Sequence, residues 1–208
     1  MSRFLPRKFV TVLLAVCGLG QVCSGQYEDN RYWNKVYRAD QAIFVHRPTA
    51  LLVNSIEGRR PGKALDIGMG QGRNSVFLAQ QGWDVTGFDP SDEGIRQAQE
   101  RAIKLGLHLR AVVAREEDFD LGIEQWDLIV MTYVRRLRAG DADRFARALR
   151  PQGIFVYENN NVGKQNELLQ GFLTWRILRF EDLDTSSDWH PERTLRVERL
   201  VAEKPAVH

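Results

Sequence analysis

The alternation of short apolar stretches with helix-like stretches constrains the fold of this chain more than any other feature. Stretches of strand length that are rich in apolar residues lie at residues 64–67, 83–88, 109–113, 126–134 and 154–157. Helix-like stretches lie between them at 74–81, at 92–105 and from Asp141 onward. In the second of these, the apolar residues share one helical face: Ile95, Ala98, Ala102 and Leu105. Strands that alternate with helices predict a parallel sheet covered by helices on both faces.

Further elements are expected on both sides of this alternating region. Residues 27–47 predict an amphipathic helix that either covers one edge of the domain or forms a lid over a ligand. A second helix is predicted at 48–56, a weaker one at 165–173, and two last strands at 177–180 and 194–202. We therefore expect an α/β fold: a Rossmann-like, doubly wound sheet of seven strands, mostly parallel, with one antiparallel strand near the C-terminal edge. No long linker or internal repeat divides residues 27–208, which predicts one domain.

The first 25 residues differ from the rest of the chain. Cationic residues (Arg3, Arg7 and Lys8) precede an apolar run from Phe9 to Gly20, and small residues follow it. This is the layout of a secretory signal peptide, and the run is short for a stable membrane span. A cleaved signal predicts export to the periplasm or the medium. The alternatives are an uncleaved anchor, or a start codon assigned too early on a cytoplasmic protein.

Composition excludes several kinds of site. The net charge is only +2 and the two signs are interspersed, whereas nucleic-acid-binding proteins concentrate Lys and Arg on one face, so no nucleic acid is expected as a partner. Both cysteines, Cys17 and Cys23, lie in the N-terminal segment, so a processed chain has no disulfide, cysteine nucleophile or cysteine zinc site. The four histidines lack metal-ligand spacing, and no metal is expected.

A glycine-rich loop follows the first predicted strand, where open α/β sheets bind their ligands. The stretch ALDIGMGQGRNS, from Ala64 to Ser75, spaces its glycines as G-x-G-x-G. A dinucleotide loop needs G-x-G-x-x-G, but Arg73 stands at the place of the last glycine. The phosphate loop G-x-x-x-x-G-K-[ST] is also absent.

Two acidic residues flank this loop. Asp66 precedes Gly68 by two residues, where a carboxylate would repel a pyrophosphate and suit a positively charged ligand without phosphate, such as S-adenosylmethionine. The alternative is that Asp66 only caps the following turn. Asp89 ends the second strand, where a carboxylate can accept hydrogen bonds from both ribose hydroxyls. Its alternative role is a helix-start cap ahead of Pro90.

The stretch ALDIGMGQGRNSVFLAQQGWDVTGFDPS resembles motif I and the second strand of class I S-adenosylmethionine-dependent methyltransferases. Its GQGRNS part is similar to the small tellurite-resistance-type methyltransferases. The resemblance continues through VVAREEDFD, WDLIVMTYV and LRPQGIFVYE, over residues 64–158. It implies S-adenosylmethionine as cofactor, with Glu116 favoured ahead of Glu117 for the adenine amino group. The implied cofactor residues are Asp66, Gly68, Met69, Gly70, Gly72, Arg73, Asn74, Asp89, Pro90, Glu116, Glu117 and Thr132.

Methyl transfer needs little chemical activation by side chains, because the sulfonium of S-adenosylmethionine is already a good leaving group. The main requirement is to hold a nucleophile in line with the methyl carbon, and a general base helps only if the acceptor must lose a proton. The catalytic residues are therefore unknown from the sequence, with Tyr133 and His190 as candidates. The residues expected to line the acceptor are Tyr32, Trp33, Tyr133, Arg135 and Glu158.

These features predict a methyltransferase that acts on a small molecule, because little chain remains outside the core to recognise a macromolecule. We expect a monomer. Two alternatives stay open. A non-catalytic S-adenosylmethionine-binding module is favoured by the predicted signal, since the methyl donor is made in the cytosol. A nicotinamide-dependent oxidoreductase is opposed by Arg73 and by the late strand pair.

Overall fold

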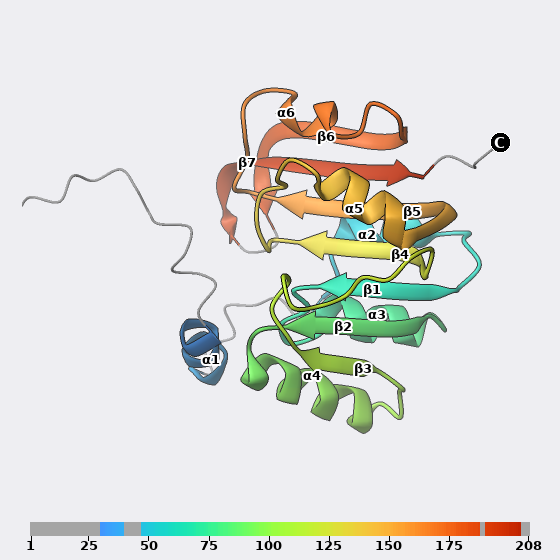
Figure 1. The fold of residues 1–208 in the computed structure, drawn as a ribbon. Helices are drawn as coiled ribbons and strands as arrows, with labels where there is room; N and C mark the ends of the chain where they lie inside the picture. The colour runs from blue at the N-terminus through green and yellow to red at the C-terminus, as the bar shows by residue number, and fades with distance from the viewer. Residues whose placement is uncertain (1–29, 40–46, 188–189, 205–208) are drawn as a thin grey trace, which may run out of the picture.

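The computed structural model describes residues 30–39, 47–187 and 190–204, and its described strands form one sheet in the order β3-β2-β1-β4-β5-β7-β6 (Figure 1). The strands are β1 (Lys63–Ile67), β2 (Asp84–Asp89), β3 (Arg110–Val113), β4 (Trp126–Thr132), β5 (Leu149–Asn159), β6 (Arg176–Ser187) and β7 (His190–Glu203). The helices are α1 (Asn30–Arg38), α2 (Ala50–Ile56), α3 (Arg73–Gln80), α4 (Asp92–Lys104), α5 (Asp141–Ala148) and α6 (Glu167–Gln170). The predicted signal peptide, residues 1–25, lies outside the described residues.

The pairing of the strands confirms the expected mostly parallel sheet. Strands β1 to β5 pair in parallel, whereas β7 is antiparallel to both of its neighbours, β5 and β6. Because β1 pairs with β2 and with β4, Ile67 at its carboxyl end has Phe88 on one side and Met131 on the other. The loops after these strands therefore open along one edge of the sheet, where a ligand site is expected.

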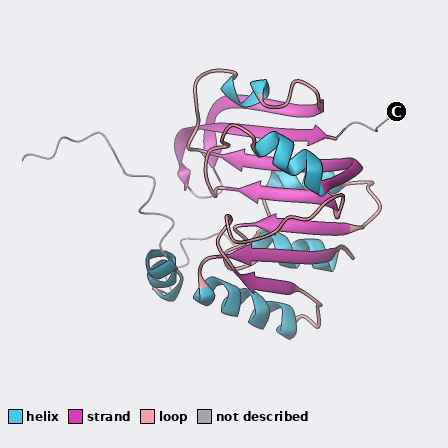
Figure 2. Cartoon of the chain, viewed as in Figure 1, coloured by secondary structure: helices cyan, strands magenta, loops and turns pink. Residues whose placement is uncertain are grey.

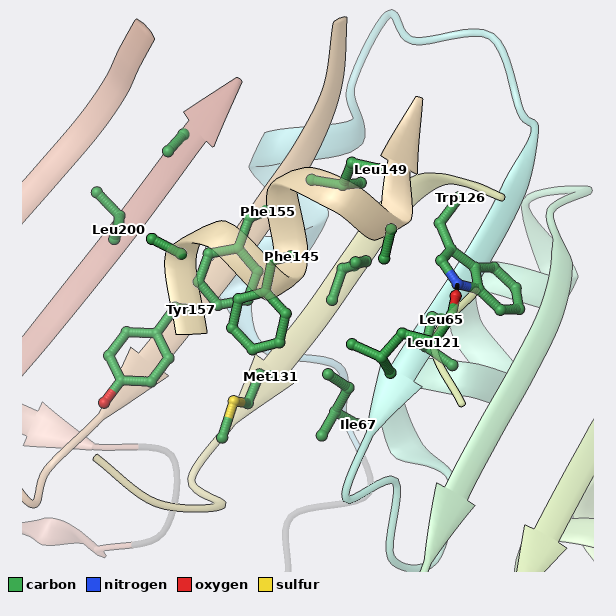
Figure 3. Close-up of a cluster of buried hydrophobic side chains, with 14 of the residues drawn as sticks. Leu65, Ile67, Leu121, Trp126, Met131, Phe145, Leu149, Phe155, Tyr157 and Leu200 are labelled. Carbon is green, nitrogen blue, oxygen red and sulfur yellow. Dashed lines mark hydrogen bonds between the residues drawn. The ribbon is translucent and has the colours of Figure 1, made fainter. Parts of the chain in front are cut away.

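Two apolar layers cover the two faces of the sheet. Alternate residues of each strand point to opposite faces, so Leu65 and Ile67 join the cluster beneath α5 while Ala64 joins the cluster beneath α2 and α3. Figure 2 shows the helices in front of and behind the strands, and Figure 3 shows Phe145 of α5 packed on Phe155 of β5. Burial on both faces explains the continuous apolar runs of the inner strands.

The C-terminal strands are longer than expected. Residues 181–193, expected as a connector, mostly belong to β6 and β7, which pair from Arg176↔Glu203 to Ser187↔His190. Most of β6 was not predicted as a strand because its sequence is polar. An edge strand packs few side chains into the core and so needs few apolar residues. β5 is also longer and begins at Leu149, which was expected to lie in the helix that starts at Asp141. Of the predicted helix at 27–47, the structure describes α1, and residues 40–46 lie outside the described part.

None of the helices in the described ranges is long and apolar enough to cross a bilayer.

Candidate functional site

The glycine loop between β1 and α3 lies at the carboxyl edge of the sheet and requires its glycines. Gly68, Gly70 and Gly72 have φ angles of 66°, 51° and 78°, which glycine adopts at little cost. Space is limiting as well: a Cβ on Gly70 would lie 2.6 Å from the hydroxyl oxygen of Tyr37, and one on Gly72 would lie 2.8 Å from the Cβ of Ala98. Tyr37 of α1 and Ala98 of α4 thus pack closely against the loop.

Asp89 is fixed beside this loop at the end of β2. Its two oxygens accept hydrogen bonds from the backbone N–H of Gly70 at 2.9 Å and of Ser91 at 2.8 Å. Burial is the main effect on this carboxyl group and raises its pKa to about 6, although both backbone bonds lower it. Each oxygen keeps a second lone pair for a ligand hydroxyl. The ribose contact predicted for Asp89 is compatible with this geometry and stays a prediction.

Asp66 lies beneath the loop rather than in the open site. Its Oδ2 accepts a hydrogen bond from the hydroxyl of Ser75 at 2.6 Å, in the first turn of α3. Burial raises the pKa of Asp66 to about 6, against lowering by Ser75 and by the charge of Arg73. This geometry favours the alternative role, support of the turn, and leaves Asp66 to act on a ligand through its charge.

Asn74 connects three elements and positions Thr132. Its Oδ1 accepts the backbone N–H of Thr49 at the start of α2, and its Nδ2 donates to the Thr132 hydroxyl, both over 3.0 Å. Both of its polar atoms are engaged and the side chain is buried. Met69 is also buried and packs on Ile95. These two predicted cofactor residues therefore support the loop from inside.

Arg73 and Tyr133 meet above the end of β4. The guanidinium carbon of Arg73 lies 5.6 Å from the centroid of the Tyr133 ring, within cation–π range. Tyr133 has a φ of 58°, an uncommon conformation for a residue with a bulky side chain. Its backbone N–H donates to the carbonyl of Glu158 at 2.8 Å, and its hydroxyl donates to the Glu158 carboxylate.

Glu158 anchors Tyr133 from within the sheet. It is only 1% exposed, and its Oε2 accepts from Arg199 of β7 at 3.1 Å. Tyr133 and Glu158, each predicted to line the acceptor, are thus bonded to each other, and Glu158 is buried within the sheet rather than on an open wall. These bonds join the end of β4 to β5 and β7. A buried, charge-assisted chain of this kind holds the Tyr133 hydroxyl in one position.

The helix α1 is docked on the start of α4 by Asn34. The Asn34 Oδ1 accepts from the Ser91 hydroxyl at 2.6 Å and from the Glu93 N–H at 3.2 Å, and its Nδ2 donates to Asp92 at 2.5 Å. Figure 1 shows α1 beside the start of α4, at the carboxyl edge of the sheet. The contact places the last turn of α1 next to the glycine loop, and both interpretations of this helix, a cover for one edge of the domain and a lid over a ligand, stay predictions.

Tyr37, in the last turn of α1, places its side chain against the glycine loop. Its ring stacks on Trp33 at 5.8 Å between centroids, and Gln97 of α4 donates to its backbone carbonyl at 3.0 Å. Burial raises the pKa of the Tyr37 hydroxyl well above its ordinary value; Asp89 raises it further and Arg73 lowers it. Sequence reasoning named Trp33 and the half-exposed Tyr32 but missed Tyr37 and Asn34. The four-residue spacing of Trp33 and Tyr37 was the available signal.

The acidic stretch after β3 is arranged differently from the expected adenine contact. Glu116 accepts hydrogen bonds from the guanidinium groups of Arg135 and Arg144, and Arg135 also pairs with Asp141 at 2.6 Å. Glu117 is largely exposed and lies 3.9 Å from Arg115. Glu116 is therefore committed to arginines, and Arg135 lies in this cluster rather than on an acceptor wall. The adenine contact stays a prediction.

Two predicted residues take no side-chain role that the structure describes. Pro90 connects Asp89 to Ser91, the N-cap of α4. His190 begins β7, at the expected edge, but its side chain lies outside the described residues. Across the described part of the chain, no group of three or more His, Cys, Asp or Glu side chains could hold a metal ion.

Known proteins resemble this chain mainly in the region that carries the loop. Residues 64–153 match the family model of a methyltransferase domain. A probable S-adenosyl-L-methionine-dependent methyltransferase, TehB, from Haemophilus influenzae is 32% identical over 122 residues, covering 57% of this chain and 37% of that protein. A ubiquinone biosynthesis O-methyltransferase from Rhizobium leguminosarum bv. trifolii is 33% identical over 160 residues, covering 72% of this chain and 58% of that protein.

The fold is similar to that of solved structures. The crystal structure of TehB from Haemophilus influenzae has a TM-score of 0.65 at 20% identity, covering 83% of this chain and 67% of that one. By contrast, the chain spans about a third to three fifths of the length of the two curated relatives described above. The similarity therefore covers the common domain and not the whole of either relative.

Proposed function

We propose that this chain, which belongs to the class I S-adenosylmethionine-dependent methyltransferases, binds S-adenosylmethionine over the glycine loop and transfers its methyl group to a small molecule. The observation that carries the proposal is the fixed carboxylate of Asp89. It is held by the N–H groups of Gly70 and Ser91, next to the glycine loop. A ribose needs such an acceptor, and the close backbone needs such glycines.

The charges around the loop fit this methyl donor. S-adenosylmethionine carries a sulfonium, an ammonium and a carboxylate, and so has one net positive charge and no phosphate. Asp66 and Asp89 provide two negative charges and Arg73 one positive charge, which leaves one net negative charge for the ligand. Asp89 would accept from the ribose hydroxyls, and Arg73 would pair with the methionine carboxylate.

The chain's own residues supply positioning and exclusion of water. The bound donor supplies an electrophilic methyl group. Tyr37 and the last turn of α1 cover the loop and would keep water from the reacting atoms. The Tyr133 hydroxyl donates a hydrogen bond to Glu158, and its oxygen keeps a lone pair that can accept a hydrogen bond from the O–H or N–H of the methyl acceptor. That contact would orient the nucleophile toward the methyl carbon.

The acceptor is proposed to be small. In the described residues after β5, the helices and strands are α6, β6 and β7, which leave little surface for recognising a macromolecule. One relative is named for O-methylation in ubiquinone biosynthesis, and a hydroxyl acceptor would suit Tyr133. We further propose export, on the strength of the N-terminal residues alone.

The experiment that tests this function is an acceptor panel with release of S-adenosylhomocysteine as the readout. The panel includes catechols and other phenols, thiols, selenite and tellurite, each with the full chain and S-adenosylmethionine. Turnover that depends on one acceptor class supports the proposal. Binding of the methyl donor without release across the panel would favour a non-catalytic binding module.

A further inference from the structure

A row of polar residues crosses the sheet at the end of β4. Thr132 of β4 lies opposite Glu158 of β5, Glu158 lies opposite Arg199 of β7, and Arg199 lies opposite Glu181 of β6. Opposite residues of neighbouring strands point to the same face of a sheet. Here that face is the one covered by α2 and α3, because the cluster there contains the residues two positions away in β4, β5 and β7: Val130, Val156 and Val201.

The row alternates in charge, and hydrogen bonds connect its members. Arg199 donates from Nε to Glu158 Oε2 and from Nη1 to Glu181 Oε2, both over 3.1 Å. Arg179 donates to the other oxygen of Glu181 at 2.8 Å. Two carboxylates therefore face two guanidinium groups, and the charge of Arg199 offsets the cost of burying the Glu158 carboxylate.

The other oxygen of Glu158 faces Tyr133. Its Oε1 accepts a hydrogen bond from the Tyr133 hydroxyl, and its backbone carbonyl accepts the Tyr133 N–H, so both bonds hold Tyr133 in its positive-φ conformation. Conformations of this kind cost energy and occur most often at functional sites. Tyr133 is itself partly exposed and carries Arg73 over its ring. A buried carboxylate is thus connected to a partly exposed hydroxyl beside the glycine loop.

A connection of this kind suits an acceptor that must lose a proton. When a hydroxyl oxygen bonds to a methyl carbon it becomes positively charged, so its proton becomes strongly acidic and a carboxylate is a strong enough base to receive it. A tyrosine between the two can pass the proton on, because its oxygen accepts one proton while its own moves to the carboxylate. Thiolates and the anions selenite and tellurite have no proton that must be removed, and this arrangement would not serve them.

We propose that Glu158 receives the proton of a weakly acidic hydroxyl acceptor through Tyr133, and that Arg199 positions the Glu158 carboxylate. The inference rests on the proposed methyl transfer and deepens it by naming the acceptor class. In the step, the acceptor oxygen bonds to the methyl carbon while the carbon–sulfur bond breaks and its electron pair stays on sulfur. The acceptor's proton goes to the Tyr133 oxygen, and the proton of Tyr133 goes to Glu158 Oε1. Glu158 returns this proton to solvent through Tyr133 after the methylated product leaves.

The test compares two phenols as acceptors for the full chain at pH 8, with release of S-adenosylhomocysteine as the readout. Catechol is protonated at this pH, whereas 4-nitrocatechol is already ionised. We expect Glu158→Gln to lower kcat about 100-fold with catechol but less than about threefold with 4-nitrocatechol, which has no proton to give up. Tyr133→Phe should show the same selective loss. Glu203→Gln removes another carboxylate of β7 that pairs with an arginine, Arg176 at 3.2 Å, and should leave both rates unchanged.

Variants of Arg199 separate positioning from support of the fold. Arg199→Gln should lose the catechol rate and keep the 4-nitrocatechol rate, and Arg199→Lys, which keeps the charge, should restore part of the catechol rate. Calorimetry should give equal affinity for S-adenosylmethionine in every folded variant. If Glu158→Gln does not fold, Tyr133→Phe carries the same comparison.

The outcomes also separate this inference from the proposed function. Equal loss with both phenols, or no loss with catechol, would overturn the inference and leave Glu158 a structural role. Methylation of thiols, selenite or tellurite without methylation of catechol would overturn it as well, but would leave the proposed methyl transfer standing. No release of S-adenosylhomocysteine with any acceptor would overturn both.

Discussion

The backbone N–H of Gly70 donates to Asp89 Oδ2 over 2.9 Å, and this bond joins the glycine loop to the end of the second strand. It fixes the carboxylate that is proposed to hold the ribose relative to the loop that is proposed to hold the methionine half. Preorganisation of this kind removes the need to order the site when the ligand binds.

Removal of the Asn34 side chain should release α1 from the start of α4. Asn34→Ala loses three hydrogen bonds to α4, and we expect affinity for S-adenosylmethionine to fall by about 1–3 kcal/mol because the cover over the loop loosens. Calorimetry and limited proteolysis of α1 measure the two effects. Lys35→Ala, exposed on the same helix, is the control. Unchanged affinity in Asn34→Ala would mean that α1 is not part of the site.

The buried carboxyl of Asp66 should make the free protein less stable as the pH rises. Its pKa is raised from an ordinary value of 3.8 to about 6, so the folded state binds more protons than the unfolded state between these values, and stability falls as pH rises through them. Asp66→Asn should remove up to about 3 kcal/mol of this loss. Urea unfolding at pH 4 and pH 7.5 measures it. The same pH dependence in variant and wild type would contradict the raised pKa.

Tyr133→Phe should separate orientation of the acceptor from binding of the donor. The variant keeps the ring beside Arg73 but loses the hydroxyl that contacts Glu158. We expect kcat to fall about 10- to 100-fold, with little change in affinity for S-adenosylmethionine. A loss of donor affinity with unchanged kcat would place Tyr133 in the donor site instead.

The fold was predictable because its inner strands are buried on both faces. Strands such as β1 and β4 are rich in apolar residues, and the helices between them keep a helical period. β6 was underestimated because its polar residues face solvent at the edge of the sheet, where only pairing with β7 makes it a strand. Hydrogen-bonded pairing between distant segments leaves no periodic signal in the sequence.

The site was predictable where its parts are close in sequence. Gly68, Gly70 and Asp89 belong to one strand–loop–helix–strand unit, so their spacing indicates their proximity. The hydrogen bond between Asn34 and Ser91 joins residues that are 57 positions apart, and no local sequence pattern predicts it. The pairing of Glu116 with Arg135 and Arg144, 19 and 28 positions away, was also not predictable, because a sequence shows that a charge is present but not which residue it pairs with.

The central claim is that Asp89 holds the methyl donor, and calorimetry with S-adenosylmethionine tests it most directly. Wild type, Asp89→Ala and Asp84→Ala are compared; Asp84 begins the same strand at its exposed end and serves as the matched control. We expect binding to wild type and to Asp84→Ala with equal affinity, and a loss of roughly 1–3 kcal/mol in Asp89→Ala, since the ribose hydroxyls lose their acceptor. Equal affinity in all three proteins, or no binding to wild type, would contradict the account.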